Sequence, residues 1–186
     1  AVKFFNKSAI FADNIAFIVP GTFRKPSLIN RLNDNFHLIR QEILPQNSFH
    51  TPSGIEYKVP TVFQVWSKKQ FKRERLNTVT EHPDFDFVKI NSSPTVQQKM
   101  EQCANSDFCI RRVGAAAGKV YEDYAEKYRD WKSHYYIRQN IDNVKDTFMS
   151  IEWDYLESPK YDTAGNPSIS KNDLISAYIR KTKEAK

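Results

Sequence analysis

Residues 14–27 read NIAFIVPGTFRKPS, and this stretch carries most of the information about the fold. An uninterrupted apolar run, 15–19, ends at Pro20-Gly21, and the basic pair Arg24-Lys25 precedes a helix start at Pro26-Ser27. An apolar run bounded by turn residues is typical of a strand buried on both faces. Such strands belong to parallel sheets, and ligands collect at their carboxyl ends. The stretch predicts either an α/β unit with a binding edge or a purely structural βα unit.

The flanking segments extend this α/β pattern. Apolar side chains within 2–11 fall roughly on one helical face, and runs at 36–39 and 60–66 read as further strands around a turn at 45–49. Farther along, we expect strands at 85–90, 108–113 and 135–138, and helices at 95–103, 121–131, 144–153 and after 170. The last helix has an N-cap signature, because an acidic residue, Asp173, follows Ser170 by three positions.

Several segments carry a family resemblance: FFNKSA, AFIVPGTFRKPS, FHL, LPQNSF, VPTVFQVW, IRRVGAAAG and SHYYIR. In this order they resemble the C-terminal half of class I S-adenosylmethionine-dependent methyltransferases, of the bacterial and phage type that methylates the amino group of DNA adenine. The similarity is strongest over 1–66, 108–138 and 163–175. It implies an incomplete methyltransferase-like sheet with flanking helices, followed by an α+β region that faces the target.

The catalytic signature of that family is missing. Its members carry a Gly-rich cofactor loop after the first strand and an Asn/Asp-Pro-Pro-Phe/Tyr motif after the fourth. The five glycines here form no G-x-G pattern, and no two prolines are adjacent. By the order of elements the Pro-Pro motif would lie just before Ala1, so either the chain is a piece of a longer polypeptide or an initiator Met was removed. We expect no catalytic residue and no cofactor site here, with S-adenosylmethionine bound only if an N-terminal half completes the enzyme.

Composition narrows the class of protein. At 186 residues and 40% hydrophobic content, the chain suits one globular domain or a core with an appendage. The longest apolar run is too short to cross a bilayer and no signal peptide opens the chain, so a cytoplasmic protein without membrane contact is expected. Cys103 and Cys109 have no His/Cys companions at zinc-ligand spacing, so we expect reduced thiols and no metal site.

The resemblance suggests three segments along the chain. Residues 1–66 would be the C-terminal part of a methyltransferase-like α/β core, 67–107 a polar connection, and 108–186 the α+β region that faces nucleic acid. Within the last, Tyr121 to Trp131 carries aromatic residues three to four apart, a helical spacing. Internal packing is the favoured interpretation of these rings, and a stacking platform for bases is the alternative.

The best binding candidate is the stretch around the Gly114–Gly118 turn. A net charge of +6 favours a polyanionic partner, and Arg111, Arg112 and Lys119 flank this turn of small residues. Arginine and lysine here would meet phosphates, unless the turn is a hairpin whose arginines form surface ion pairs. Because strand residues alternate sides, the two arginines cannot share a face without a bulge, and Arg112 is the preferred contact.

Four other residues complete the predicted nucleic-acid surface. His134 lies in the SHYYIR segment, which the resemblance places in the target-facing region. Arg24 and Lys25 follow the predicted binding edge, and Lys171 lies in the first turn of a helix, where its charge opposes the helix dipole. We expect Arg111, Arg112, Lys119 and His134 to lie on one face, except that one of the two arginines must point to the other side unless a bulge intervenes.

The predicted partner is DNA. A missing N-terminal methyltransferase half or a second copy of the chain is also expected, because an incomplete sheet exposes an edge strand. Three functions stay open. The chain is the C-terminal portion of a DNA adenine methyltransferase, a stand-alone, non-catalytic phage or prophage protein that binds DNA, or a structural or interaction protein whose basic clusters are solvated surface.

Overall fold

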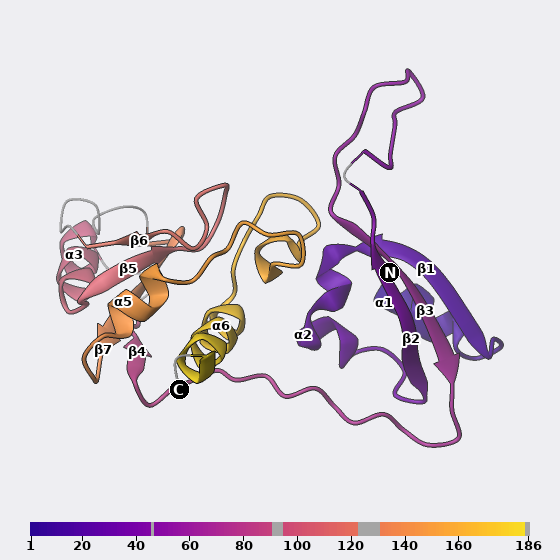
Figure 1. The fold of residues 1–186 in the computed structure, drawn as a ribbon, viewed down its shortest axis with the longest axis horizontal. Coiled ribbons are helices and arrows are strands. Elements are labelled where there is room, and N and C mark those ends of the chain that lie inside the picture. Colours follow the sequence, from indigo (N-terminus) through magenta and orange to yellow (C-terminus); the bar gives the residue numbers. More distant parts are fainter. Residues whose placement is uncertain (46, 91–94, 123–130, 185–186) are drawn as a thin grey trace. The chain divides into compact units, whose positions relative to one another are not determined.

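The computed structural model describes residues 1–45, 47–90, 95–122 and 131–184, and the chain divides into two compact units (Figure 1). Unit 1 comprises 1–78 and 156–166, and unit 2 comprises 79–155 and 167–186. Unit 1 therefore receives a segment from late in the sequence. Among the described residues, no helix combines the length and the apolar character needed to cross a bilayer.

Unit 1 is a three-stranded antiparallel sheet with helices on one face. Its elements are α1 (Val2–Ser8), β1 (Asn14–Pro20), the 3-10 helix η1 (Gly21–Arg24), α2 (Pro26–Ile29), β2 (Phe36–Ile43), β3 (Thr61–Lys68) and η2 (Pro159–Tyr161). The strand order is β1-β3-β2, so both β1 and β2 lie at edges of this sheet. The expected strands at 36–39 and 60–66 are confirmed.

The prediction that β1 belongs to a parallel sheet and is buried on both faces is wrong. The strand pairs antiparallel with β3, with Ile18 opposite Phe63. Ile15 and Val19 are buried in the core, whereas Ile18 is 57% exposed. An antiparallel sheet can be covered on one face only, and the apolar residues on the other face then stay accessible.

Aromatic packing holds the covered face of unit 1. Phe5 of α1 is fully buried and meets Phe36 and Trp66 edge to face, with ring centroids 5.6 and 5.5 Å apart. The expected helical face within 2–11 is only partly formed, because α1 ends at Ser8 and Phe11 is 78% exposed.

Unit 2 is a four-stranded antiparallel sheet with helices. Its elements are β4 (Phe85–Phe87), α3 (Val96–Ala104), β5 (Phe108–Arg111), β6 (Val120–Tyr121), β7 (His134–Gln139), α5 (Val144–Met149) and α6 (Lys171–Glu184), and the strand order is β4-β7-β5-β6. Two small antiparallel sheets with helices make this a mixed α/β protein, which confirms the broad class. The expected helix at 121–131 begins instead with strand β6, and residues 123–130 lie outside the described part.

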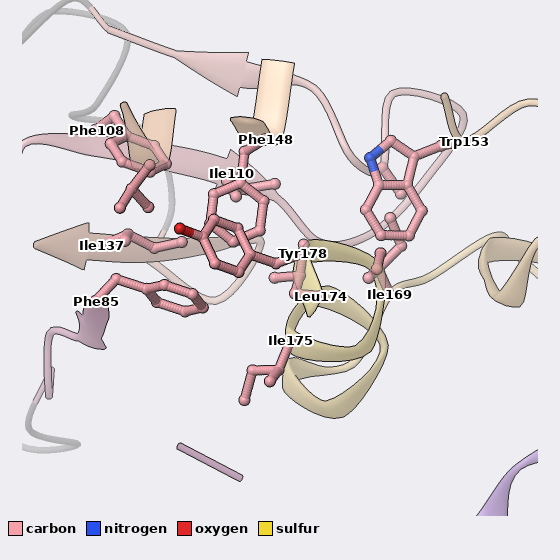
Figure 2. Packing of buried hydrophobic residues seen from close by; sticks show 13 residues of the cluster. Phe85, Phe108, Ile110, Ile137, Phe148, Trp153, Ile169, Leu174, Ile175 and Tyr178 are labelled. Atoms are coloured by element: carbon pink, nitrogen blue, oxygen red, sulfur yellow. The ribbon is translucent and has the colours of Figure 1, made fainter. Parts of the chain in front are cut away.

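The alternation of strand residues gives the unit 2 sheet two apolar faces. On one face Phe108, Ile110 and Ile137 pack against α5 and α6, and Figure 2 shows their side chains converging on Tyr178 and Leu174. The other face bears the members of a second cluster: Cys103, Cys109, Tyr121 and Tyr136. Both cysteines are buried free thiols. Each face of the sheet thus packs into its own apolar cluster.

Capping interactions set the start of two helices in unit 2. Thr95 accepts from the Gln98 backbone while the Gln98 side chain accepts from Thr95, which is a capping box at α3. At α6, the Ser170 backbone and hydroxyl both donate to Asp173 Oδ2, at 2.8 and 2.7 Å, which confirms the predicted cap. Lys171 consequently occupies the first position of α6, as expected.

Candidate nucleic-acid interface

Unit 2 contains a pocket whose walls combine cations and aromatic rings. Its volume is about 420 Å³, and we call it the cationic pocket; its lining residues are Phe87, Val88, Ile90, Arg112, Trp131, Lys132, His134, Tyr135, Tyr136 and Lys171. Three of these are lysine or arginine, and none of the lining residues just given carries a carboxylate. The residues come from β4 and the segment after it, from β7 and the segment before it, from the residue after β5 and from the start of α6. Such a pocket complements a ligand that has both negative charge and planar apolar surface.

Arg112 lies against the ring of Tyr135. Its backbone N–H donates to the carbonyl of Ser133 at 2.9 Å, which continues the pairing of β5 with β7. The guanidinium carbon is 5.2 Å from the centroid of the Tyr135 ring. Within the described part of the chain, the buried Arg112 Nε has no hydrogen-bond partner. The guanidinium is therefore held mainly by an aromatic face.

Lys171 brings a second cation to the same pocket from the first turn of α6. Its ammonium lies 4.5 Å from the centroid of the Phe87 ring. Partial burial, and then the nearby charge of Arg112, lower the pKa of Lys171 from its ordinary value. An anion placed near Lys171 and Arg112 would relieve this repulsion.

The ring of Tyr135 contacts two other residues of the pocket. The face of the ring carries Arg112, and Phe87 meets the ring edge to face with centroids 5.5 Å apart. Burial raises the pKa of Tyr135 even though the charge of Arg112 acts in the opposite direction. Lys132 completes the set of cations, with its ammonium 5.6 Å from the ring of Trp131. Each cation in the pocket is paired with its own ring.

The predicted residues around the glycine turn divide between two places. Arg112, His134 and Lys171 line the cationic pocket, whereas Arg111 and Lys119 are not among its lining residues. The Arg111 side chain turns back to donate to the carbonyl of Val113 at 2.9 Å, and the Lys119 ammonium lies 4.9 Å from the Tyr121 ring. The alternation of strand β5 thus separates the two arginines.

His134 is a buried wall residue. It is 3% exposed, its Nδ1 lies 3.1 Å from the Ser133 hydroxyl, and its ring meets Tyr121 edge to face at 5.6 Å. The register places it opposite Arg111. His134 therefore contributes its buried ring to the wall of the pocket.

The small residues of the glycine turn accommodate the protein's own core. A Cβ added to Gly118 would lie 2.3 Å from Cδ1 of Trp153, and Gly114 donates its N–H to the carbonyl of Pro167 at 2.8 Å. Both glycines have positive φ, 83° at Gly114 and 97° at Gly118. The sequence suggested that a partner comes close to the backbone of this turn. In the structure, the side chain of Trp153 lies there instead.

Arg24 and Lys25 lie in unit 1. The Arg24 guanidinium is 3.0 Å from Oδ1 of Asp162 and donates to the carbonyl of Glu157 at 2.9 Å. A Cβ at Gly21 would lie 2.9 Å from the Tyr161 carbonyl oxygen. The segment 157–163 thus covers the end of β1, where a ligand was expected. Arg24 binds this segment through Asp162 and Glu157.

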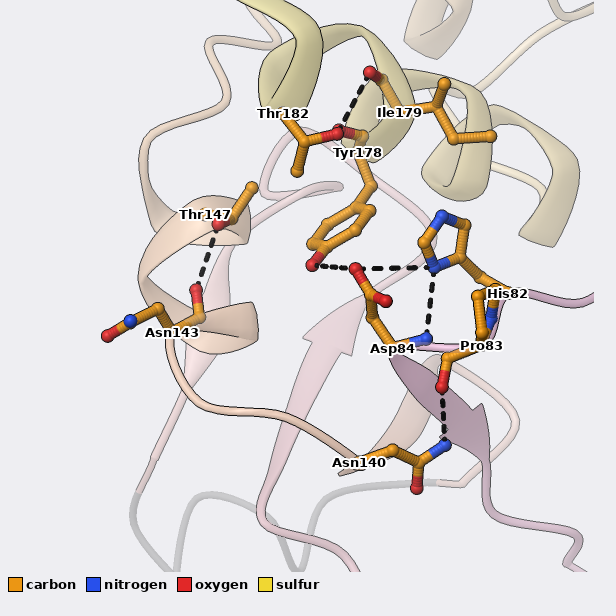
Figure 3. A network of polar contacts seen from close by, with 9 residues as sticks. All are labelled: His82, Pro83, Asp84, Asn140, Asn143, Thr147, Tyr178, Ile179 and Thr182. Atoms are coloured by element: carbon orange, nitrogen blue, oxygen red, sulfur yellow. Dashed lines mark hydrogen bonds and ion pairs between the residues drawn. The ribbon is translucent and has the colours of Figure 1, made fainter. Parts of the chain in front are cut away.

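A polar network joins β4 to α6 beside the cationic pocket (Figure 3). Tyr178 donates to Asp84 Oδ2 at 2.9 Å, and the Asp84 backbone donates to His82 Nδ1 at 3.2 Å. His82 also lines a neighbouring groove of about 470 Å³ that includes Glu81, Asp86 and Lys171. This groove carries carboxylates, which distinguishes it from the cationic pocket.

Sequence reasoning missed the pocket residues Phe87, Lys132 and Tyr135 as binding candidates. Phe87 was recognised only as part of an alternating strand, and Trp131 was assigned to internal packing, with base stacking as the alternative. Adjacent aromatic and basic residues in the sequence Trp131-Lys132 and Tyr135-Tyr136 were the available signal. Nothing in the sequence alone brings them beside Arg112.

Neither metal-binding side chains nor comparisons with known proteins assign a role to this chain. No group of three or more His, Cys, Asp or Glu residues in the described ranges is placed to hold a metal ion. Comparisons with protein-family models, curated proteins and solved structures found no match for this chain.

Proposed function

We propose that this chain binds DNA through the cationic pocket of unit 2. The observation that carries the proposal is the convergence of Arg112, Lys132 and Lys171 on one concave surface, whose lining residues named above include aromatic rings and no carboxylate. Lysine and arginine supply most contacts to the nucleic-acid backbone, and aromatic rings supply contacts to bases. The net charge of +6 favours the approach of a polyanion.

The relation to DNA adenine methyltransferases is a wider proposal, and it rests on the sequence segments from FFNKSA to SHYYIR. In this proposal the chain contributes the part that faces DNA, and an N-terminal half supplies S-adenosylmethionine and the Pro-Pro motif. The alternative is a stand-alone, non-catalytic DNA-binding protein of phage or prophage type. Both share the pocket as the contact surface, so a DNA-binding experiment tests their common element.

The experiment is a salt titration of DNA binding. Arg112→Gln combined with Lys171→Gln removes two charges from the pocket, and the matched control, Arg180→Gln with Lys183→Gln, removes the same two kinds of charge from the other end of α6. Binding of a fluorescent oligonucleotide is followed by anisotropy over a range of salt concentrations. The pocket variant should lower the slope of log K against log salt by roughly 0.7–0.9 for each phosphate that it no longer binds.

The control pair should bind as the wild type does. Both of its side chains are exposed, and the Arg180 guanidinium donates to the Tyr155 hydroxyl at 3.2 Å, away from the pocket residues. Equal losses of affinity in the two double variants would mean diffuse attraction to a basic protein, and the proposal would then be wrong. Retention of wild-type affinity in the pocket variant would refute it equally.

A further inference from the structure

We infer that the ligand of the cationic pocket is an unpaired nucleotide of a single strand, with its base among the aromatic walls and its phosphate on the cations. The inference rests on the proposed DNA-binding function and names the form of DNA that the pocket prefers. It follows from three features: the concave aromatic lining, the backing of Arg112 by Tyr135, and a second groove that continues the path.

The aromatic lining lies inside a concavity. Phe87, Trp131 and Tyr135 line a pocket of about 420 Å³, and Phe87 and Tyr135 are half-buried. In a duplex the faces of the bases are covered by their neighbours, so the rings of a pocket meet only the phosphates at the rim. An unpaired base exposes its planar face and can enter to stack. The aromatic wall therefore contributes to the binding of a single strand only.

Arg112 offers a second kind of planar surface. Its guanidinium lies 5.2 Å from the ring centroid of Tyr135, and that ring also packs edge to face on Phe87. A guanidinium backed by an aromatic ring can stack on a base with its free face and donate to a phosphate with its N–H groups. Lys171, over Phe87, supplies a point charge for the same phosphate.

A second groove extends the path beyond the first nucleotide. This groove, of about 550 Å³, shares Phe87 and Val88 with the cationic pocket; its other lining residues are Asp86, Lys89, Gln102, Asn105 and Arg138. Lys89 and Arg138 are cations, and Arg138 also pairs with Asp86 at 3.0 Å. Gln102 and Asn105 carry amides, which hydrogen-bond base edges. The next nucleotide would lie here, on the far side of Phe87.

The charges of the two neighbouring grooves decide in which direction the bound nucleic-acid strand leaves the pocket. The groove that shares Lys171 with the pocket contains the carboxylates of Glu81 and Asp86 against that single lysine. The groove that shares Val88 contains two cations against one carboxylate. A phosphate backbone is therefore directed from the cationic pocket toward Arg138.

The test compares three probes by fluorescence anisotropy at one salt concentration. They are an oligothymidine of about ten nucleotides, which is within the usual site size of single-strand binders, the corresponding duplex, and the same strand with abasic positions. The single strand should bind about tenfold or more tightly than either of the other two. Equal or tighter binding of the duplex, or wild-type affinity for the abasic strand, would overturn the inference.

Two variants separate stacking from charge. Arg112→Lys keeps the positive charge and removes the planar guanidinium, so the salt slope should stay the same while affinity for the single strand falls by about fivefold or more. Tyr135→Leu should weaken single-strand binding likewise and leave duplex binding unchanged. Thermal melting checks that Tyr135→Leu is folded; if it is not, Arg112→Lys decides, and wild-type affinity in that variant would contradict stacking.

The second groove has its own variant. Lys89→Gln combined with Arg138→Gln should weaken binding of the oligothymidine and leave the binding of thymidine 5′-monophosphate unchanged. The same loss of affinity for both probes, or no loss for either, would show that the strand does not follow this path.

The outcomes distinguish this inference from the proposed function. If duplex and single strand bind equally and both depend on Arg112 and Lys171, the protein binds DNA through phosphates and the inference alone fails. If neither probe depends on these residues, the proposed function fails as well. A phosphotyrosine peptide that binds more tightly than the oligothymidine would overturn both, because its ring and phosphate satisfy the same chemistry.

Discussion

The hydroxyl of Tyr178 donates a hydrogen bond to Oδ2 of Asp84 at 2.9 Å and thereby joins α6 to the residue that precedes β4 (Figure 3). Tyr178 is 2% exposed, and its ring packs on Phe85 with centroids 5.1 Å apart. The cationic pocket draws Phe87 from β4 and Lys171 from α6. This hydrogen bond therefore helps to fix the two sides of the pocket relative to each other.

Tyr178→Phe should lower the free energy of unfolding by about 1 kcal/mol, because it removes one partly buried hydrogen bond and leaves the ring in place. Urea unfolding followed by circular dichroism measures the change. Tyr57→Phe is the control, since Tyr57 is 59% exposed and its hydroxyl should contribute less than about 0.5 kcal/mol. An equal effect in the two variants would contradict a structural role for the contact with Asp84.

The same hydroxyl should make stability depend on alkaline pH. Burial, and then the hydrogen bond and charge of Asp84, raise the pKa of Tyr178 above its ordinary value. A group whose pKa is higher in the folded state contributes its full stabilisation below its unfolded pKa, about 10, and loses it as pH rises further. Wild-type stability should fall above about pH 10 more steeply than that of Tyr178→Phe; parallel curves would refute this.

Gly118→Ala should be strongly destabilising, by about 3 kcal/mol, because the new Cβ meets the Trp153 ring and φ is +97°. Gly114→Ala provides the control within the same turn. Gly114 has a φ of +83°, but a Cβ there has no atom within 4 Å, so only backbone strain of about 1 kcal/mol remains. Thermal unfolding should rank the wild type first, Gly114→Ala second and Gly118→Ala last.

Arg24→Ala should destabilise unit 1 by about 3 kcal/mol, since it removes both the ion pair with Asp162 and the hydrogen bond to the Glu157 carbonyl. The side chains of Arg24 and Asp162 are 17% and 9% exposed, so solvent screens this pair weakly. Hydrogen exchange should increase over 157–163. Lys58→Ala is the control, because Lys58 is 69% exposed and lies 4.0 Å from Glu56, a pair worth less than about 1 kcal/mol. Unchanged exchange over 157–163 in Arg24→Ala would contradict the fastening role.

S-adenosylmethionine should not bind to this chain alone. The sequence has no G-x-G loop to receive the cofactor, and no acidic residue follows such a loop to hold its ribose. Isothermal titration calorimetry should give no heat of binding for S-adenosylmethionine. Micromolar affinity would show that a cofactor site exists that the sequence motifs do not reveal.

Local signals predicted the helices and strands that depend on neighbours in the chain. The caps at Thr95 and Ser170 are made with residues three positions away, so the sequence contains both partners of each contact. The strand expected at 108–113 is likewise found, as Phe108–Arg111. Such features need no knowledge of the rest of the fold, because their energy comes from contacts within one turn or one strand.

Strand direction could not be predicted in this way. The run 15–19 satisfies the pattern of a buried parallel strand, yet it pairs antiparallel with β3 and leaves Ile18 exposed. The covering of each face depends on helices and on the segment 156–166, which returns to unit 1 from late in the chain. An apolar run specifies that a strand can be buried, and only its tertiary neighbours decide on how many sides.

The candidate site, too, has features that the sequence predicted and features that only the tertiary structure set. The sequence by itself marked Arg112 and Lys171 as cations in unusual places, one beside a glycine turn and one at the start of a helix. Only the tertiary structure decided that they share a pocket with Phe87 and Tyr135 and that Arg111 does not line it. The physical reason is register: the pairing of β5 with β7 and the docking of α6 set which side chains meet, and these long-range contacts leave no signature in any single stretch of sequence.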